Sequence, residues 1–227
     1  MMRLLKTTFI LFFMLASAGI SAQENNAPQL STSEDSLYYS IGVTFSDLLR
    51  QSGLNEIDPA LVVQGMVDGL KGNEKIDKQV ASLYISSYML AKKKEEAKEN
   101  LAESKKFLEE NKNKPGVYTT QSGLEYKILK EGSGQFPVDT SKVTVNYTGT
   151  LLDGTVFDSS SRRSHPTVLE VKRVIPGWRE ALEMMQAGSK WKIWIPPSLG
   201  YGENVKNDSP IGPNMVLVFE IELVKIQ

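Results

Sequence analysis

The residues of this chain that could do chemistry are mostly aromatic and aliphatic, and they gather near turns in its second half. The stretch VIPGWREAL, residues 174–182, places Trp178 directly after a Pro-Gly pair, at the start of a helix expected over residues 178–186. Comparable runs are VNYTGTLLDGTVFDSS, IPPSLGYGE and MVLVFEIEL. An indole at such a place either fills the core or forms the floor of a pocket. Both interpretations remain open on this pattern alone.

Groups for covalent or metal chemistry are scarce. The chain has no cysteine and a single histidine, His165, which lies in the polar stretch SSSRRSHPT and is expected at the surface. The sequence shows no nucleophile elbow and no phosphate-binding glycine loop. If the protein is an enzyme, its reaction is expected to need no nucleophile, no strong general base, no metal and no cofactor.

Length and charge limit the remaining classes. A chain of 227 residues is long enough for one large domain or two modest ones. Its net charge of −1 offers no positive field to a phosphate backbone, so nucleic acid is not expected as a partner. The ordinary apolar and charged fractions, 41% and 23%, predict a globular protein.

The first residues read as a secretory signal peptide over residues 1–22. Arg3 and Lys6 precede an apolar run, and small residues end at Ala22. A membrane anchor is the alternative, but the apolar run of about a dozen residues is shorter than the roughly 20 that span a bilayer. We expect an exported protein of the periplasm or cell envelope, with no membrane span after cleavage. A polar leader follows over residues 23–33.

Residues 34–114 are expected to be helical. Apolar residues recur at helical spacing in a first helix that Ser33 could cap, and Asp58-Pro59 begins a second. A long helix over residues 76–112 contains neither proline nor glycine. Its charged second half reads as a solvated spacer, whereas its apolar first half needs a partner. We therefore expect this region to form a homodimer.

Residues 115–227 show the patterns of strands. The segments LEYKILK, KVTVNYTG, SKWKIWIP and MVLVFEIELVKI alternate or are rich in β-branched and aromatic residues, and turn signals separate them. Together with the expected helix 178–186, they predict an α+β fold, in which an antiparallel sheet wraps around one short helix. The all-α region with its long connecting helix precedes this sheet.

From about Gly123 to Ile226 the chain resembles the FKBP-type peptidyl-prolyl cis-trans isomerases. The resemblance rests on motifs that occur in the same order: Tyr147-Thr148-Gly149, Asp153-Gly154, Phe157-Asp158-Ser159-Ser160, Val174-Ile175-Pro176-Gly177-Trp178, Tyr201-Gly202 and Leu217-Val218-Phe219. The helical region is similar to the N-terminal dimerisation domain of the exported, macrophage infectivity potentiator-like branch of the family.

The resemblance implies a shallow apolar pocket for a proline ring. Trp178 would be its floor, and the Pro176-Gly177 turn would aim the indole into the cavity. Asp158 and Tyr201 would lie at the rim and hold the substrate carbonyl through hydrogen bonds, together with the backbone N–H of Ile175. The remaining residues implied at the pocket are Tyr147, Phe157, Leu169, Val174, Ile211 and Phe219. Leu169 and Leu199 stand where the family often has aromatic residues, so sequence preference and binding of macrolide inhibitors are expected to differ.

Two functions follow from this resemblance. In the first, the protein is an isomerase that assists the folding of exported proteins and acts on proline-containing and unfolded polypeptides, with chaperone activity in addition. In the second, it is a non-catalytic holdase that binds unfolded clients in a cleft of the helical dimer. A chain that begins near Gly116 distinguishes the two. In the first case it keeps full activity on short proline peptides, and in the second its suppression of aggregation is lost with the helices.

Overall fold

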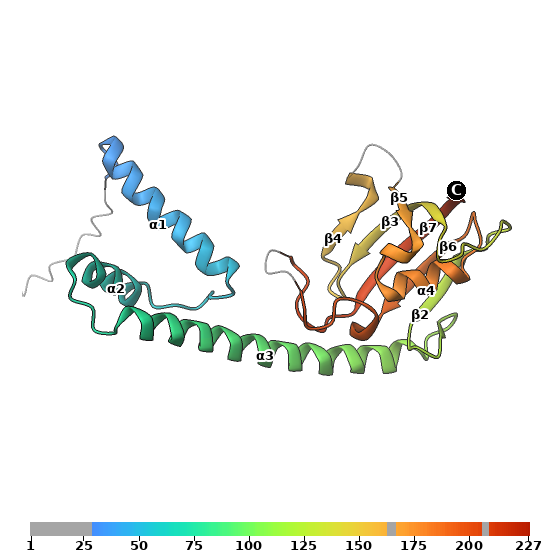
Figure 1. The fold of residues 1–227 in the computed structure, drawn as a ribbon, viewed down its shortest axis with the longest axis horizontal. Helices are drawn as coiled ribbons and strands as arrows, with labels where there is room; N and C mark the ends of the chain where they lie inside the picture. The colour runs from blue at the N-terminus through green and yellow to red at the C-terminus, as the bar shows by residue number, and fades with distance from the viewer. Residues whose placement is uncertain (1–28, 163–166, 206–208) are drawn as a thin grey trace, which may run out of the picture. The chain divides into compact units, whose positions relative to one another are not determined.

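A computed structural model describes residues 29–162, 167–205 and 209–227. The expected signal peptide, most of the polar leader and His165 lie outside these residues. The chain divides into two compact units at Leu49/Arg50, and each is described by itself. No helix of the described part has an apolar stretch long enough to cross a membrane. The helices before the sheet are α1 (Ser33–Gln51), α2 (Pro59–Lys71) and α3 (Lys78–Asn111) (Figure 1).

The start of α1 differs by one residue from the expectation. Thr32, not Ser33, caps the helix, because its Oγ1 accepts a hydrogen bond from the N–H of Asp35 at 3.0 Å. In return, Oδ2 of Asp35 accepts from the N–H of Thr32 at 2.8 Å. This reciprocal pair is a capping box with an aspartate in place of the usual glutamate. Gly53 follows the helix with a φ of 76°, a conformation that glycine adopts without strain.

The start and end predicted for α2 are confirmed. The Asp58 carboxylate accepts hydrogen bonds from the N–H groups of Ala60 and Leu61, and Pro59 occupies the first helical position. Gly72 ends the helix in the left-handed conformation, with a φ of 67°. Neither α1 nor α2 contains a buried residue.

The long helix α3 contacts the sheet region with one face of its charged half. Ala97, Ser104 and Asn111 are buried along this face. Phe107 and Leu108, which lie between them, pack against Trp194, Val216 and Val218. The expectation that the charged half is a wholly solvated spacer is therefore wrong. The contacting residues are spaced three or four apart and lie on one side of the helix, while the charged residues cover the other.

Seven strands of the described chain form one antiparallel sheet. The path runs β1-β2-β6-β7-β3-β4, and β5 pairs with β3 beyond the end of the β3–β4 ladder. The long central ladder joins β3 to β7, with Val145 opposite Leu223 and Tyr147 opposite Ile221. The strands are β1 (Tyr118–Thr119), β2 (Glu125–Lys130), β3 (Lys142–Thr150), β4 (Val156–Ser159), β5 (Thr167–Glu170), β6 (Lys190–Ile195) and β7 (Leu217–Ile226). Three short 3-10 helices span Ser160–Arg162, Val171–Arg173 and Pro197–Leu199.

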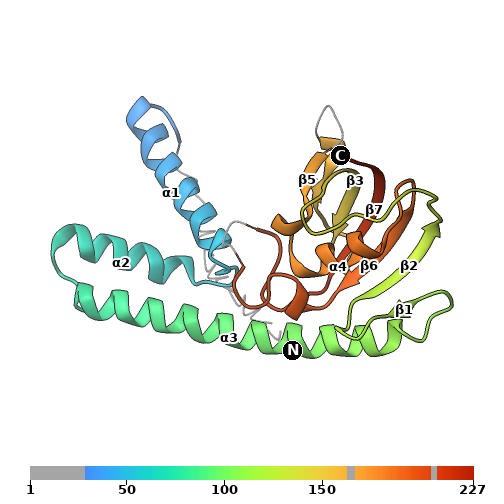
Figure 2. The same cartoon turned by 45° about the vertical axis from the view of Figure 1, so that its right-hand side comes forward.

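The short helix α4 (Pro176–Met184) lies against one face of this sheet (Figures 1 and 2), and the core lies between the two. The α+β fold predicted from the sequence is thus confirmed. The helix begins two residues earlier than expected, because Pro176 occupies its first position, where a proline's missing N–H costs nothing. Gly177 belongs to the helix too, and a Cβ there would lie 2.6 Å from Cγ2 of Ile195, so this glycine lets α4 approach β6 closely.

Candidate active site

Trp178 lies at the centre of a set of aromatic rings. It projects from the first turn of α4 and is 4% exposed. The rings of Tyr147 and Phe219 meet the indole at centroid distances of 5.0 and 5.2 Å, each with an interplanar angle of 88°. Edge-to-face packing of this kind places the positive ring edge against the negative face. With Phe157, these residues form what we call the aromatic cluster: Tyr147, Phe157, Trp178 and Phe219.

The sheet register brings the cluster together. Gly149 of β3 pairs with Phe219 of β7, and Tyr147 lies two residues earlier on the same strand, so both rings point to the face that α4 covers. Phe157 of β4 completes the cluster with a perpendicular contact to Phe219 at 5.3 Å. A Cβ on Gly149 would lie 2.6 Å from Phe219 and 2.8 Å from Phe157. Glycine is therefore the residue that lets the two rings meet over the strand.

The polar groups predicted at the rim do interact. Oη of Tyr147 donates a hydrogen bond of 2.6 Å to Oδ2 of Asp158. Tyr201 is 46% exposed, and burial of its phenol together with the negative charge of Asp158 raises its pKa above the ordinary value of 10.0. The phenol of Tyr201 thus keeps its proton throughout the neutral range and can donate it in a hydrogen bond.

The backbone around Ile175 supplies a further donor. The carbonyl of Ile175 accepts hydrogen bonds from the N–H groups of Trp178 and Arg179, at 3.0 and 3.1 Å, and so begins α4. Its own N–H has no hydrogen-bond acceptor within the described part of the chain. A donor placed at the mouth of a helix and next to an aromatic cluster is suited to a carbonyl oxygen of a bound peptide.

The structure places the other predicted wall residues on the same core. Val174, Ile175 and Leu169 are partly buried and pack against the cluster that contains Trp178, and Ile211, 8% exposed, is a member of it. One detail of the sequence prediction is wrong: Pro176 and Gly177 are not a turn before the helix but its first residues. The indole is held mostly within the packed core and is not aimed outward by a turn.

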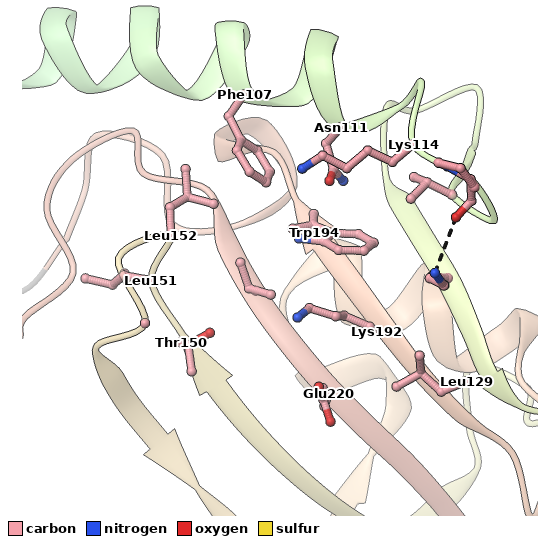
Figure 3. A pocket seen from close by; sticks show the side chains of 15 residues that line it. Phe107, Asn111, Lys114, Leu129, Thr150, Leu151, Leu152, Lys192, Trp194 and Glu220 are labelled. Carbon is pink, nitrogen blue, oxygen red and sulfur yellow. Dashed lines mark hydrogen bonds between the residues drawn. The ribbon is translucent and has the colours of Figure 1, made fainter.

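A groove of about 560 Å³ lies on the face of the sheet opposite the aromatic cluster, between the end of α3 and the outer sides of β2, β6 and β7. Figure 3 shows Phe107 and Asn111 projecting from α3 toward Trp194. Lys114 and Lys192 extend over aromatic rings in the groove, with Nζ 5.3 Å from the centroid of Phe107 and 5.7 Å from that of Trp194. The groove contains none of the residues predicted for the proline site.

Sequence reasoning missed the polar contacts that join α3 to the sheet region. Asn111, 1% exposed, donates from Nδ2 to Oε2 of Glu125 at 2.7 Å, and Glu125 is 2% exposed. Nearer the start of the same helix, Oγ of Ser104 donates to the carbonyl of Asn214 at 2.7 Å. A usable signal existed: between residues 97 and 111 the uncharged residues other than Ala102 recur at helical spacing, at positions 97, 100, 101, 104, 107, 108 and 111.

Two family models match the chain and together cover most of it. The model described as "FKBP-type peptidyl-prolyl cis-trans isomerase" matches residues 133–224. The model described as "Domain amino terminal to FKBP-type peptidyl-prolyl isomerase" matches residues 34–128, which include α2, α3 and all of α1 except its first residue.

Individual proteins are similar to this chain over most of their own length and of its length. The Outer membrane protein MIP of Legionella longbeachae is 41% identical over 210 residues, which cover 89% of each chain. The FKBP-type 22 kDa peptidyl-prolyl cis-trans isomerase of Escherichia coli (strain K12) is 40% identical over 205 residues, covering 88% of this chain and 98% of the relative. The crystal structure of FkpA from Escherichia coli superimposes with a TM-score of 0.67 at 30% identity, covering 88% of this chain and 99% of FkpA.

Proposed function

Because this chain belongs to the family of FKBP-type peptidyl-prolyl cis-trans isomerases, we propose that its aromatic cluster binds proline in a polypeptide and accelerates rotation about the preceding peptide bond. The observation that carries this proposal is the perpendicular packing of Tyr147 and Phe219 against Trp178, with the carboxylate of Asp158 bonded to the Tyr147 phenol. These side chains offer apolar contact and hydrogen bonds, and the reaction needs nothing else.

Rotation about the X-Pro bond requires no reactive group. The barrier of about 18–20 kcal/mol arises from amide resonance, and at X-Pro bonds it makes isomerisation take tens to hundreds of seconds. The planar amide separates charge between oxygen and nitrogen, whereas the twisted transition state does not. An apolar site therefore disfavours the planar form more than the twisted one, and walls that fit the twisted form add differential binding. A gain of about 7 kcal/mol corresponds to roughly five orders of magnitude in rate.

We infer distinct roles for the polar residues. The N–H of Ile175 and the protonated phenol of Tyr201 donate to substrate carbonyl groups. Asp158 was expected to bond the carbonyl as well, but an ionised carboxylate only accepts hydrogen bonds. Its role is to fix the Tyr147 ring through the 2.6 Å bond. Trp178 and Phe219 contact the proline ring, and the side walls are formed by Phe157, Leu169, Val174 and Ile211.

The test is turnover of a short X-Pro peptide by the chain from residue 23 onward. Asp158→Ala is expected to lower kcat/KM about tenfold or more, which corresponds to about 1.4 kcal/mol of lost transition-state stabilisation. Asp139→Ala, which removes a carboxylate 57% exposed in the same half of the chain, is the matched control and keeps the wild-type rate. Wild-type turnover by Asp158→Ala would remove that residue from the site.

We also propose that residues 34–114 form a homodimer that carries two catalytic regions, each spanning residues 115–227. Large apolar side chains are exposed on all three helices, including Ile41 at 51%, Leu61 at 71% and Leu83 at 71%. Large apolar side chains exposed on helices in this number are characteristic of interaction sites. A second copy covers it best, because two-fold association is the commonest way for a soluble chain to bury such a surface.

The same exposed surface supports a chaperone role, in which apolar side chains that the dimer leaves uncovered bind unfolded clients. Export to the periplasm or cell envelope rests on the pattern of residues 1–22. The clients would then be exported polypeptides whose folding waits on proline isomerisation. Macrolides that fill the proline site would inhibit turnover without affecting the helical region, which separates the isomerase from the holdase activity.

A further inference from the structure

Asn214 joins three segments of the chain that are distant in sequence. It is 6% exposed, and its φ of 56° is the only positive value among the described residues other than glycine. Its N–H donates to the carbonyl of Gly202 at 2.8 Å, and its carbonyl accepts from Oγ of Ser104 at 2.7 Å. Its side-chain amide donates to the carbonyl of Ala97 at 3.0 Å and lies 3.4 Å from Oε1 of Glu203. Nearly all of its polar atoms are thus engaged.

The contact with α3 extends to the residues before Asn214. Nδ2 of Asn100 donates to the carbonyl of Pro213 at 2.8 Å. A Cβ on Gly212 would lie 2.9 Å from Oε1 of Glu96 and 3.1 Å from Nδ2 of Asn100, so the helix lies directly against this loop. The loop 211–214 is therefore held by one face of α3, through Ala97, Asn100 and Ser104. We call this set of three helix residues the clamp.

The held loop leads directly into the proposed proline site. Ile211, at its first position, belongs to the same packed core as Trp178. On its other side, the bond from Asn214 to Gly202 ties the loop to the turn that carries Tyr201. Ile211, a wall residue of the proposed site, and Tyr201, a proposed hydrogen-bond donor, are thus both attached to backbone that contacts with α3 hold in place.

We propose that the clamp on α3 positions Ile211 and Tyr201, and that the long helix thereby sets the substrate selectivity of the isomerase site. This inference rests on the proposed function. Ala97, Asn100, Ser104 and Asn214 are positioning residues, because they act through the loop 211–214. A buried carbonyl that loses its donor must find another partner, and a backbone in the left-handed conformation is held there only by its surroundings. Without the clamp, we expect the loop 211–214 to be less tightly held in this conformation.

The experiment compares Ser104→Ala and Asn100→Ala with the matched control Ser87→Ala, which makes the same kind of change at an exposed part of α3 where Ser87 bonds only its own helix. Asn214→Gly is the fourth variant. It keeps the left-handed backbone available and removes only the side-chain bonds to Ala97 and Glu203. All variants are made in the chain from residue 23 onward.

The first measurement is amide hydrogen exchange, which needs no turnover. In Ser104→Ala, Asn100→Ala and Asn214→Gly the amides of residues 211–216 are expected to exchange at least tenfold faster, while those of β6 and β7 keep their wild-type rates. Ser87→Ala leaves all of them unchanged. If exchange in the loop is unaltered in the three variants, the clamp does not hold the loop and the proposal is overturned, whatever the activity.

The second measurement is isomerase activity on peptides that differ only in the residue before proline. The three variants are expected to change the ratio of kcat/KM between a bulky and a small residue at this position by at least threefold, mostly through KM. An unchanged ratio with faster loop exchange would overturn the selectivity role. If the wild-type chain itself accelerates isomerisation of none of these peptides, the proposed function is contradicted. The hydrogen-exchange result would still decide whether the helix holds the loop.

Discussion

The phenol of Tyr147 donates a hydrogen bond of 2.6 Å to the carboxylate of Asp158, across two strands that lie side by side in the sheet. The same ring meets the indole of Trp178 edge-on. One side chain thus contacts both Asp158, the proposed polar rim of the site, and Trp178, its proposed apolar floor. The geometry makes Tyr147 a more informative target than either neighbour, because a single oxygen atom can be removed from it while the ring stays.

Tyr147→Phe is expected to lower kcat/KM about three- to tenfold with little change in fold. The carboxylate of Asp158 loses its donor and moves more freely, and a three- to tenfold effect corresponds to about 0.7–1.4 kcal/mol of transition-state stabilisation. Peptide turnover and near-ultraviolet circular dichroism measure the two effects. A variant with wild-type kcat/KM would show that orientation of Asp158 contributes nothing to the rate.

Trp178→Leu is expected to reduce kcat/KM at least tenfold and to abolish the change in tryptophan fluorescence that a bound peptide causes. The indole is 4% exposed and packs against two rings, so truncation to alanine would also cost about 3–5 kcal/mol of stability. Leucine is used here because it fills more of the volume of the indole than alanine does. Trp191 and Trp194 remain as internal references, and a persisting fluorescence change in Trp178→Leu would contradict the assignment of Trp178 as the floor.

Gly149→Ala tests the close approach of the two phenylalanine rings. The new methyl group would lie 2.6 Å from Phe219 and 2.8 Å from Phe157, so both rings must shift. We expect a loss of about 1–3 kcal/mol in the free energy of unfolding and a KM raised severalfold. Urea unfolding and peptide kinetics measure these effects. Gly65→Ala in α2 is the control, because nothing lies within 4 Å of the position of its Cβ and its backbone does not have a positive φ.

The parts of this fold that follow from local chemistry were predictable, and those that depend on distant contacts were not. Asp58-Pro59 caps a helix through its own neighbours, so its role is visible in the sequence. The motif around Trp178 was identified, but Pro176 was assigned to a turn, since a Pro-Gly pair is typical of turns as well as of helix starts. The face of α3 at Ala97 and Ser104 carries small residues. Its role as a contact surface could not be predicted, because its partner Asn214 lies more than a hundred residues away in the sequence.

Glu125→Gln tests the buried carboxylate of β2 that accepts a hydrogen bond from Asn111, the last residue of α3. Burial is the largest effect on Glu125 and raises its pKa above the ordinary value of 4.5, and the charge of Glu109 also raises it. The hydrogen bond from Asn111 and the charges of Lys112 and Lys114 lower the pKa, but by less. The folded chain therefore holds this proton to higher pH than the unfolded chain does. The stability that protonation gives is complete below about pH 4.5 and is lost as the pH rises through the folded-state pKa.

The glutamine variant cannot ionise and can still accept the hydrogen bond from Asn111. At neutral pH its free energy of unfolding is expected to exceed that of the wild type by about 1 kcal/mol, and the difference should vanish in acid. Urea unfolding between pH 4 and 8 measures both. Parallel pH profiles for the two proteins would show that Glu125 does not titrate with folding. Asn111→Ala has the opposite sign, because it leaves the buried carboxylate without its donor.

Ile41→Asp tests the proposed homodimer. Ile41 lies on α1 with Leu37 and Leu48 on the same side of the helix, and the three side chains are 51–57% exposed. A carboxylate placed in an apolar interface must be desolvated without a partner, so the variant is expected to shift the chain from dimer to monomer by at least tenfold in dissociation constant. Ser46→Asp adds the same charge well away from Ile41 around the same helix and is the control.

Sedimentation velocity over a concentration series measures the equilibrium between dimer and monomer. Peptide turnover per chain is expected to stay constant, because the residues proposed for each site all belong to one copy of the chain. A wild-type chain that sediments as a monomer at every concentration would exclude the dimer, whereas a dimer that survives Ile41→Asp would place its interface on α2 and α3.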